Sequence, residues 1–155
     1  MQAAGLVNDH TTDCFRHPVN LSAQTTGQRT SNSRTASLST IRIKRVYDAP
    51  APNDGCRILV DRLWPRGLSK EAAHVNLWQK DLAPSTKLRT WFGHNPARWP
   101  EFQTRYFTEL DQNTKAVEDL LQQARYNPVT ILFGARNEKY NNAVALKAYL
   151  SRHFG

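Results

Sequence analysis

Hydrophobic and polar positions follow two different periods in the last three quarters of the chain. Residues 41–46 alternate apolar and basic side chains, the period-two pattern of a strand with one solvated face. Two short apolar runs rich in β-branched residues, at 57–61 and 129–133, are typical of strands buried on both faces. We therefore expect three strands, with a loop over 48–55 that contains an Asp-Gly turn pair.

Helical patterns separate the second expected strand from the third and also follow the third. The expected helices are a short one after Ser69, a second over 84–92 that ends at Gly93, a third with the stripe Trp99, Phe102, Tyr106 and Leu110, a fourth over 114–125 and a fifth over 141–153. Either Asn95-Pro96 caps the third helix or Pro100 is its first residue. Buried strands separated by helices predict an α/β fold: a small, mostly parallel sheet with helices packed on both faces, in a Rossmann-like three-layer arrangement.

The first 40 residues have a different composition. Residues 22–40 are mostly Ser, Thr, Gln, Asn and Arg, with no acidic and no aromatic residue. Such a segment has too little apolar surface to offset its ordering entropy, so 1–40 is predicted to be a disordered N-terminal tail. A targeting peptide is the alternative, which Asp9 and Asp13 weaken. One folded domain is then expected over 41–155.

The charge of the chain indicates an anionic partner. It has 155 residues and a formal net charge of +8. Residues 41–155 hold 18 bases and 11 acids, so +7 of this charge lies in the expected domain. Anionic small molecules, nucleotides and nucleic acids are the corresponding partner classes.

Other compositional features narrow the class of protein. The two cysteines form no C-x-x-C pair and the histidines have no metal-ligand spacing, so neither a metal site nor a cofactor is expected. No run of apolar residues is long enough to span a membrane. A cytoplasmic location is expected, and the sequence does not indicate an oligomeric state.

The segment Asp61-Arg62-Leu63-Trp64-Pro65-Arg66-Gly67 carries the strongest candidate chemistry. It follows a buried strand, where open α/β sheets bind their ligands. Arg62 and Arg66 suit a phosphate or carboxylate, Trp64 can stack on a planar group, and Asp61 is the candidate catalytic base. The alternative is structural: Arg62 pairs with Asp54 or Asp61 as a clamp, while Trp64 and Leu63 simply pack.

The loop after the last expected strand, residues 134–142, offers further ligand-binding candidates. Arg136 adds a third guanidinium and Asn141 lies where the last helix begins. If the two buried strands are neighbours, the guanidiniums of Arg62, Arg66 and Arg136 converge. The alternative for either asparagine of this loop is an ordinary turn role. A weaker candidate is an aromatic group around Gly93, which is either core or the wall of a cleft: Trp91, Phe92, His94 and Trp99.

Several motifs in order resemble the YeaO-like branch of the bacterial domain-of-unknown-function family 488. They are Lys44-Arg45-Val46-Tyr47-Asp48, the Asp-Gly turn, residues 57–67, Asp81-Leu82-Ala83-Pro84-Ser85, Trp91-Phe92-Gly93-His94 and Pro128-Val129-Thr130-Ile131-Leu132. The resemblance covers 41–152 and implies a small cytosolic α/β protein that binds an anionic or nucleotide-like ligand at the 61–67 loop. Relatives often carry a histidine where this chain has Tyr140-Asn141-Asn142, which puts acid–base catalysis in doubt.

Two function hypotheses follow, and neither decides whether the protein is an enzyme. In the first, the domain binds a phosphorylated or nucleotide-like small molecule through its Arg/Trp loop. In the second, it is a nucleic-acid-binding or regulatory accessory protein, whose Arg42, Lys44, Arg57 and Arg66 contact phosphates while exposed tryptophans stack on bases.

Overall fold

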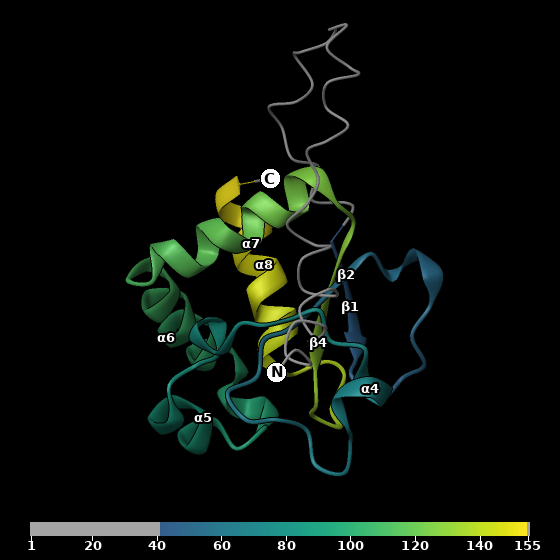
Figure 1. Cartoon of the computed structure of the whole chain (residues 1–155). Coiled ribbons are helices and arrows are strands. Elements are labelled where there is room, and N and C mark those ends of the chain that lie inside the picture. Colours follow the sequence, from purple (N-terminus) through teal and green to yellow (C-terminus); the bar gives the residue numbers. More distant parts are fainter. Residues whose placement is uncertain (1–40, 155) are drawn as a thin grey trace, which may run out of the picture.

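The computed structural model describes residues 41–154, so the tail predicted over 1–40 lies outside the described residues. Four parallel strands form one sheet in the order β1-β4-β2-β3 (Figure 1). Their bounds are β1 Ile41–Arg45, β2 Cys56–Leu59, β3 Leu77–Trp78 and β4 Val129–Phe133. The predicted α/β fold with a parallel sheet is confirmed.

The third strand, β3, was not predicted from the sequence. It has two residues, Leu77 and Trp78, which pair with Ile58 and Leu59 of β2. A two-residue strand is too short to show a period of its own. It exists because β2 offers unpaired backbone groups on the side away from β4.

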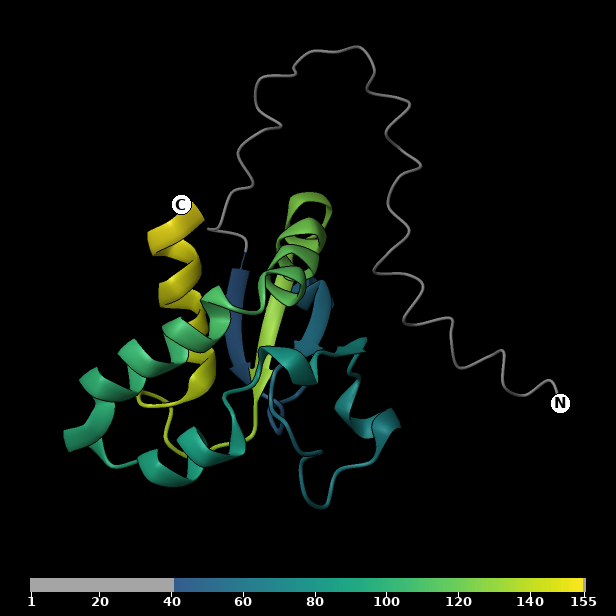
Figure 2. The ribbon, with the colours of Figure 1, turned by 90° about the vertical axis from the view of Figure 1, so that its left-hand side faces the viewer.

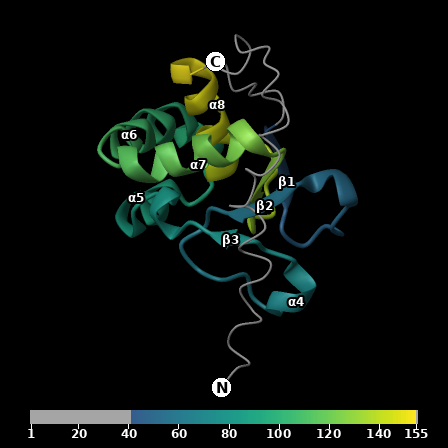
Figure 3. The same cartoon turned by 45° about the horizontal axis from the view of Figure 1, so that its top comes forward.

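Within residues 41–154, five α-helices surround the sheet: α4 Lys70–Ala73, α5 Thr86–Phe92, α6 Trp99–Asp111, α7 Thr114–Tyr126 and α8 Asn142–Phe154. The same part of the chain has three 3₁₀ turns: η3 Pro52–Asp54 between β1 and β2, η4 Lys80–Leu82 between β3 and α5, and η5 Pro96–Arg98 between α5 and α6. Helices α5 to α8 cover one face of the sheet, and the short α4 lies on the opposite side (Figures 1 and 3). Seen from the side of α5 to α8, the strands lie next to one another behind these helices (Figure 2). No helix among residues 41–154 has the length and apolar character needed to cross a membrane.

The two faces of the sheet bury different amounts of apolar surface. Between the sheet and α5 to α8 lies the larger core, which includes Ile58, Ile131 and Leu146. On the other face Leu59 and Leu132 pack with a smaller group that Trp64 and Trp78 partly cover. All five residues of β4 are buried, as expected for the central run, whereas β1 lies at an edge and exposes Arg42.

The start of α6 resolves the alternatives left by its two prolines. The Asn95 side chain accepts a hydrogen bond from the Ala97 backbone N–H and so caps the short turn η5. Helix α6 then begins at Trp99, with Pro100 in its first turn, where the missing N–H of proline costs nothing.

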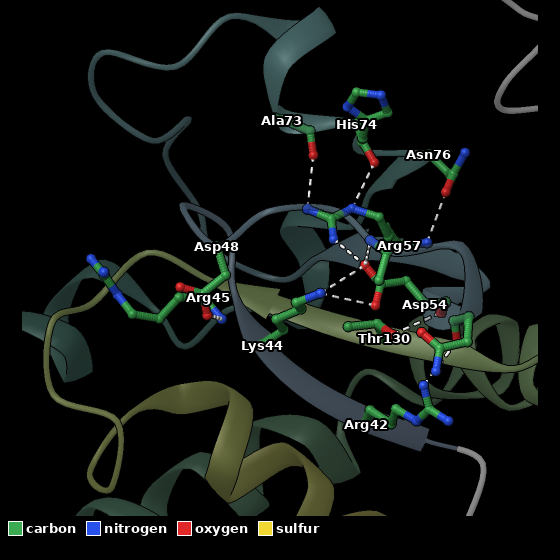
Figure 4. A network of polar contacts seen from close by, with 12 residues as sticks. Arg42, Lys44, Arg45, Asp48, Asp54, Arg57, Ala73, His74, Asn76 and Thr130 are labelled. Carbon is green, nitrogen blue, oxygen red and sulfur yellow. Dashed lines mark hydrogen bonds and ion pairs between the residues drawn. The ribbon is translucent and has the colours of Figure 1, made fainter.

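A buried ion pair holds the amino edge of the sheet, opposite to the candidate ligand edge (Figure 4). Asp54 and Arg57, exposed by 4% and 3%, pair through Oδ2 and Nη1 at 2.5 Å. The same guanidinium donates to the carbonyl oxygens of His74 and Ala73, and Lys44 Nζ adds a second ion pair to Asp54 at 3.1 Å. The clamp predicted between Arg62 and Asp54 is therefore wrong, because the partners of Asp54 are Arg57 and Lys44.

Candidate functional site

A cavity of about 180 Å³ lies at the carboxyl edge of the sheet, beyond the ends of β2 and β4. Its position follows from the topology, since parallel strands that are neighbours bring their following loops together. The lining residues come from both loops, from α5, α6 and α8, and from the segments on either side of α5: Asp61, Arg62, Leu63, Ala83, Pro84, Arg89, Phe92, His94, Phe102, Ala135 and Asn142.

The Asp61 carboxylate is held between the ends of the two central strands. Its Oδ2 accepts a hydrogen bond from the Gly134 N–H at 2.8 Å, and its Oδ1 accepts one from Asn142 Nδ2 at 3.2 Å. The Asn142 amide also donates to the Val60 carbonyl oxygen, and Trp78 Nε1 donates to the Asp61 carbonyl oxygen. The carboxylate thus has one fixed orientation in the wall of the cavity.

Burial raises the pKa of the Asp61 carboxyl above its ordinary value of 3.8. The hydrogen bonds from Gly134 and Asn142 and the positive charges of His94 and Arg89 act in the opposite direction, but they do not cancel the effect of burial. Between 3.8 and the raised pKa, the folded protein binds a proton that the unfolded chain has released. The contribution of Asp61 to the free energy of unfolding therefore decreases as pH rises through this window.

We expect a carbon-detected NMR titration to place the pKa of Asp61 above 3.8 and that of Asp54 below it. Asp54 is the internal control, because the Ala51 N–H, Lys44 and Arg57 together lower its pKa in spite of burial. If Asp61 titrated at or below 3.8, the cations of the cavity would stabilise its charge more strongly than burial opposes it.

Two arginines and a histidine place hydrogen-bond donors at the same cavity. Arg62 follows β2 and its Nε lies 3.5 Å from the Pro84 carbonyl oxygen. Arg89 is an exposed residue of α5, one turn before Phe92. His94 follows α5, and its Nδ1 lies 3.3 Å from the Tyr140 carbonyl oxygen. Guanidinium groups from two separate segments are suited to hold a phosphate or carboxylate.

Local sequence explains how α5 presents Arg89 and His94. Ser85 caps the helix by accepting from the Leu88 N–H, and Glu109 of α6 accepts from both the backbone N–H and the hydroxyl of Ser85. The helix ends at Gly93 with φ 49°, and His94 also has a left-handed φ of 57°. Such a backbone costs a non-glycine residue about 1–3 kcal/mol and is common at functional sites.

The inner wall of the cavity is aromatic. The rings of Phe92 and Phe102 stack with centroids 4.2 Å apart, and Tyr106 continues the stack behind Phe102. The buried Tyr106 hydroxyl donates to the Leu82 carbonyl oxygen and ties α6 to the segment before Ala83. An apolar wall of this kind excludes water and strengthens the charge interactions beside it.

The structure brings two of the predicted site residues, Asp61 and Arg62, into the cavity lining. Trp64 lies outside the lining, where its ring packs edge-on against Trp78 at 5.2 Å and its Nε1 donates to the Leu68 carbonyl oxygen.

The remaining predicted residues also lie outside the lining. Arg66 and Arg136 are exposed, so the three guanidiniums do not converge on this cavity although β2 and β4 are neighbours as supposed. Asn141 is buried: its Oδ1 accepts from the Val144 N–H and its Nδ2 donates to the Asn137 carbonyl oxygen, which is a turn and helix-start role.

Sequence reasoning missed Arg89 and chose Asn141 instead of Asn142. Arg89 lies three residues before Phe92 on a helix, so the two share a face, and this spacing was a usable signal. No comparable signal separates the two asparagines, because the start of α8 decides which side chain faces the cavity. From the aromatic group around Gly93, Phe92 and His94 line the cavity.

Among residues 41–154, no group of three or more His, Cys, Asp or Glu side chains is arranged to hold a metal ion. The polar chemistry of the cavity consists instead of two guanidiniums, an imidazole, a carboxylate and an amide. Such a set can bind an anionic group and hydrogen-bond a second polar group next to it.

Comparisons with known proteins point to the same family as the sequence motifs. Residues 40–154 match the family model described as "Inactive DUF488-N3 subclade". The uncharacterized protein YeaO of Escherichia coli K12 is 40% identical over 110 residues, which cover 71% of this chain and 96% of YeaO. The uncharacterized protein Rv3073c of Mycobacterium tuberculosis H37Rv is 39% identical over 111 residues, 72% of this chain and 93% of that protein. No solved structure gives a significant match. With the family model covering the whole described fold, the chain belongs to the DUF488 family, in its inactive N3 subclade.

Proposed function

We propose that this protein binds a small anionic molecule, through a phosphate or carboxylate group, in the cavity at the carboxyl edge of its sheet. The observation that carries the proposal is the lining itself: Arg62, Arg89 and His94 come from separate segments and border one cavity with a mostly apolar wall. Arg89 and His94 have no ion-pair partner among residues 41–154, so they are available to an external anion.

Binding without turnover is the form of this function that we favour. The matching family model carries the word "inactive" in its description. The loop where a histidine is expected from the resemblance has Tyr140-Asn141-Asn142 here, and the Asn142 amide donates to Oδ1 of Asp61. An amide is neither a general acid nor a general base near neutral pH, so Asn142 does not give Asp61 the acid–base partner that it would need as a catalytic base.

The size of the cavity limits the ligand. A protein cavity of about 150 Å³ is known to enclose benzene, so about 180 Å³ takes a molecule of only slightly larger size. A phosphorylated or carboxylated fragment fits, whereas a whole nucleotide extends beyond the cavity.

Two of the four basic residues supposed to contact phosphates in the nucleic-acid alternative, Arg57 and Lys44, are held in ion pairs, whereas Arg42 and Arg66 are exposed. Arg57 is buried in the ion pair with Asp54, Lys44 pairs with the same carboxylate, and Arg42 donates to the Asn53 carbonyl oxygen. None of the four tryptophans is among the exposed large hydrophobic residues of the described chain. The guanidiniums of Arg98 and Arg105 already lie over the Trp91 ring, at 5.2 and 4.5 Å from its centroid.

Arg89→Gln is expected to weaken anion binding about tenfold, since a hydrogen bond to a charged group contributes about 1.5–3 kcal/mol. Because Arg89 is exposed, the free energy of unfolding should change by less than about 0.5 kcal/mol. Calorimetric titration of the full chain with inorganic phosphate, ethyl phosphate and propionate measures the first effect, and urea unfolding measures the second.

Arg66→Gln is the matched control, because it removes the same charge from an exposed residue outside the cavity lining. It should leave the affinity within about twofold of wild type at 0.15 M salt, where charges more than about 8 Å apart are largely screened. Equal losses in the two variants would contradict a defined site. A steep dependence on salt, with binding only of oligonucleotides, would favour the nucleic-acid alternative.

A further inference from the structure

Asp61 is an acidic group in a cavity that is otherwise basic. The ion pairs among residues 41–154 are Lys44–Asp54, Arg57–Asp54, Arg105–Glu101 and Lys115–Asp119, so Asp61 has no ion-pair partner there. Its hydrogen-bond donors, the Gly134 N–H and the Asn142 amide, are both neutral. The cavity therefore contains a fixed carboxylate whose charge is not balanced by direct contact.

Asp54, a buried carboxylate at the other end of the sheet, differs from Asp61 because it has cationic partners. Asp54 has two cationic partners, Arg57 Nη1 at 2.5 Å and Lys44 Nζ at 3.1 Å, and a backbone donor, the Ala51 N–H. Removing a carboxylate from water without a counter-ion costs several kcal/mol. A neutral acceptor at position 61 would satisfy the Gly134 N–H at a lower cost. The unpaired charge of Asp61 is thus not explained by the hydrogen bonds that it makes.

Asn142 adds a second acceptor beside the carboxylate. Its Nδ2 donates to the Val60 carbonyl oxygen and to Asp61 Oδ1, which leaves its own Oδ1 without a hydrogen bond among residues 41–154. One side of the lining thus offers acceptors, from Asp61 and Asn142, and the remaining polar lining offers donors, from Arg62, Arg89 and His94. A ligand that matches both sets has an anionic group and a donor group a few bonds apart.

We infer that the ligand of this cavity carries an ammonium group beside its phosphate or carboxylate, as amino acids and phosphorylated amines do. This inference rests on the proposed anion binding and adds the class of ligand. The anionic group contacts Arg62, Arg89 and His94, while the ammonium group donates to Asp61 and forms the direct ion pair that Asp61 does not have within residues 41–154. The cavity volume of about 180 Å³ suits such small zwitterions.

The test compares ligands that differ only in the ammonium group, by calorimetric titration of the full wild-type chain. The two pairs are O-phosphoethanolamine against ethyl phosphate, and β-alanine against propionate. The ammonium-bearing member of at least one pair is expected to bind about tenfold more tightly or better, as a hydrogen-bonded charge pair predicts. Which pair shows the preference tells whether the anionic group is a phosphate or a carboxylate.

Two further measurements assign the preference to Asp61. In Asp61→Asn, the advantage of the ammonium-bearing member should fall to within about twofold of its partner, while Arg89→Gln should weaken both members alike. In wild type, an NMR titration should show the pKa of Asp61 falling when the ammonium-bearing ligand binds and rising with the other member.

The possible outcomes separate the two proposals. Equal or tighter binding of the member without the ammonium group, in wild type and in both pairs, would overturn this inference and leave anion binding intact. A preference that persists in Asp61→Asn would also overturn it. If no member of either pair and no inorganic phosphate bound, the proposed function would fail and the inference with it.

Discussion

Gly55→Ala is expected to lower the free energy of unfolding by more than about 3 kcal/mol, enough to unfold a large part of a small domain at 37 °C. Gly55 has φ 69° and ψ −137°, a conformation that only glycine adopts readily. A Cβ at this position would lie 2.2 Å from the Pro128 carbonyl oxygen. That oxygen accepts the Cys56 N–H at 2.9 Å, where β2 first meets β4, so the clash would separate the two central strands.

The matched control for this prediction is Gly67→Ala. Gly67 has a similar φ of 72°, but an added Cβ would meet no atom within 4 Å. The free energy of unfolding should therefore fall only by the cost of a left-handed backbone conformation in alanine, about 1–2 kcal/mol. Urea unfolding of both variants measures the difference. Similar losses in the two would mean that the close approach of Gly55 to Pro128 contributes nothing.

Arg57→Met is expected to lower the free energy of unfolding by about 3–5 kcal/mol, because it leaves the buried Asp54 carboxylate without its main partner. The guanidinium also donates to the carbonyl oxygens of Ala73 and His74, at the end of α4, and these acceptors would lose their donors. Lys44→Met is the control: the Lys44 side chain is 24% exposed and contacts the same carboxylate. Removing it should cost only about 1 kcal/mol.

The free energy of unfolding at acid pH gives an independent test of the Asp54–Arg57 ion pair. Burial by itself raises the pKa of Asp54, but hydrogen bonds from Ala51, Lys44 and Arg57 lower it further than burial raises it. Asp54 therefore stabilises the fold above its ordinary pKa of 3.8, and this stabilisation is lost as pH falls through the lowered value. In Arg57→Met this acid-dependent part of the unfolding free energy should shrink. An unchanged pH profile, or equal losses in Arg57→Met and Lys44→Met, would contradict the assigned role of Arg57.

Only part of the candidate site could be predicted from the sequence. The segment after β2 was predicted to face a ligand, and its Asp61 and Arg62 line the cavity. Arg66 and Arg136 were predicted to bind the same ligand, because Arg66 is close to Arg62 in the sequence and Arg136 lies in the loop after the other buried strand. The cavity instead brings in Arg89, His94 and Asn142, which lie 27 to 80 residues further along the chain and join the site through the packing of α5 and α8.

Local sequence patterns are enough to predict the types and approximate bounds of most elements. The period-two run at β1, the apolar run at β4 and the stripe on α6 all record which face of an element is buried, and that preference is local. The motifs also identified the family.

Tertiary packing sets the strand order β1-β4-β2-β3, the existence of β3, the pairing of Asp54 with Arg57 and the composition of the cavity. These features depend on contacts between segments far apart in the chain. Such contacts are selected by the packing of whole faces and by the pairing of buried polar groups, and neither leaves a periodic trace in the sequence around any one residue.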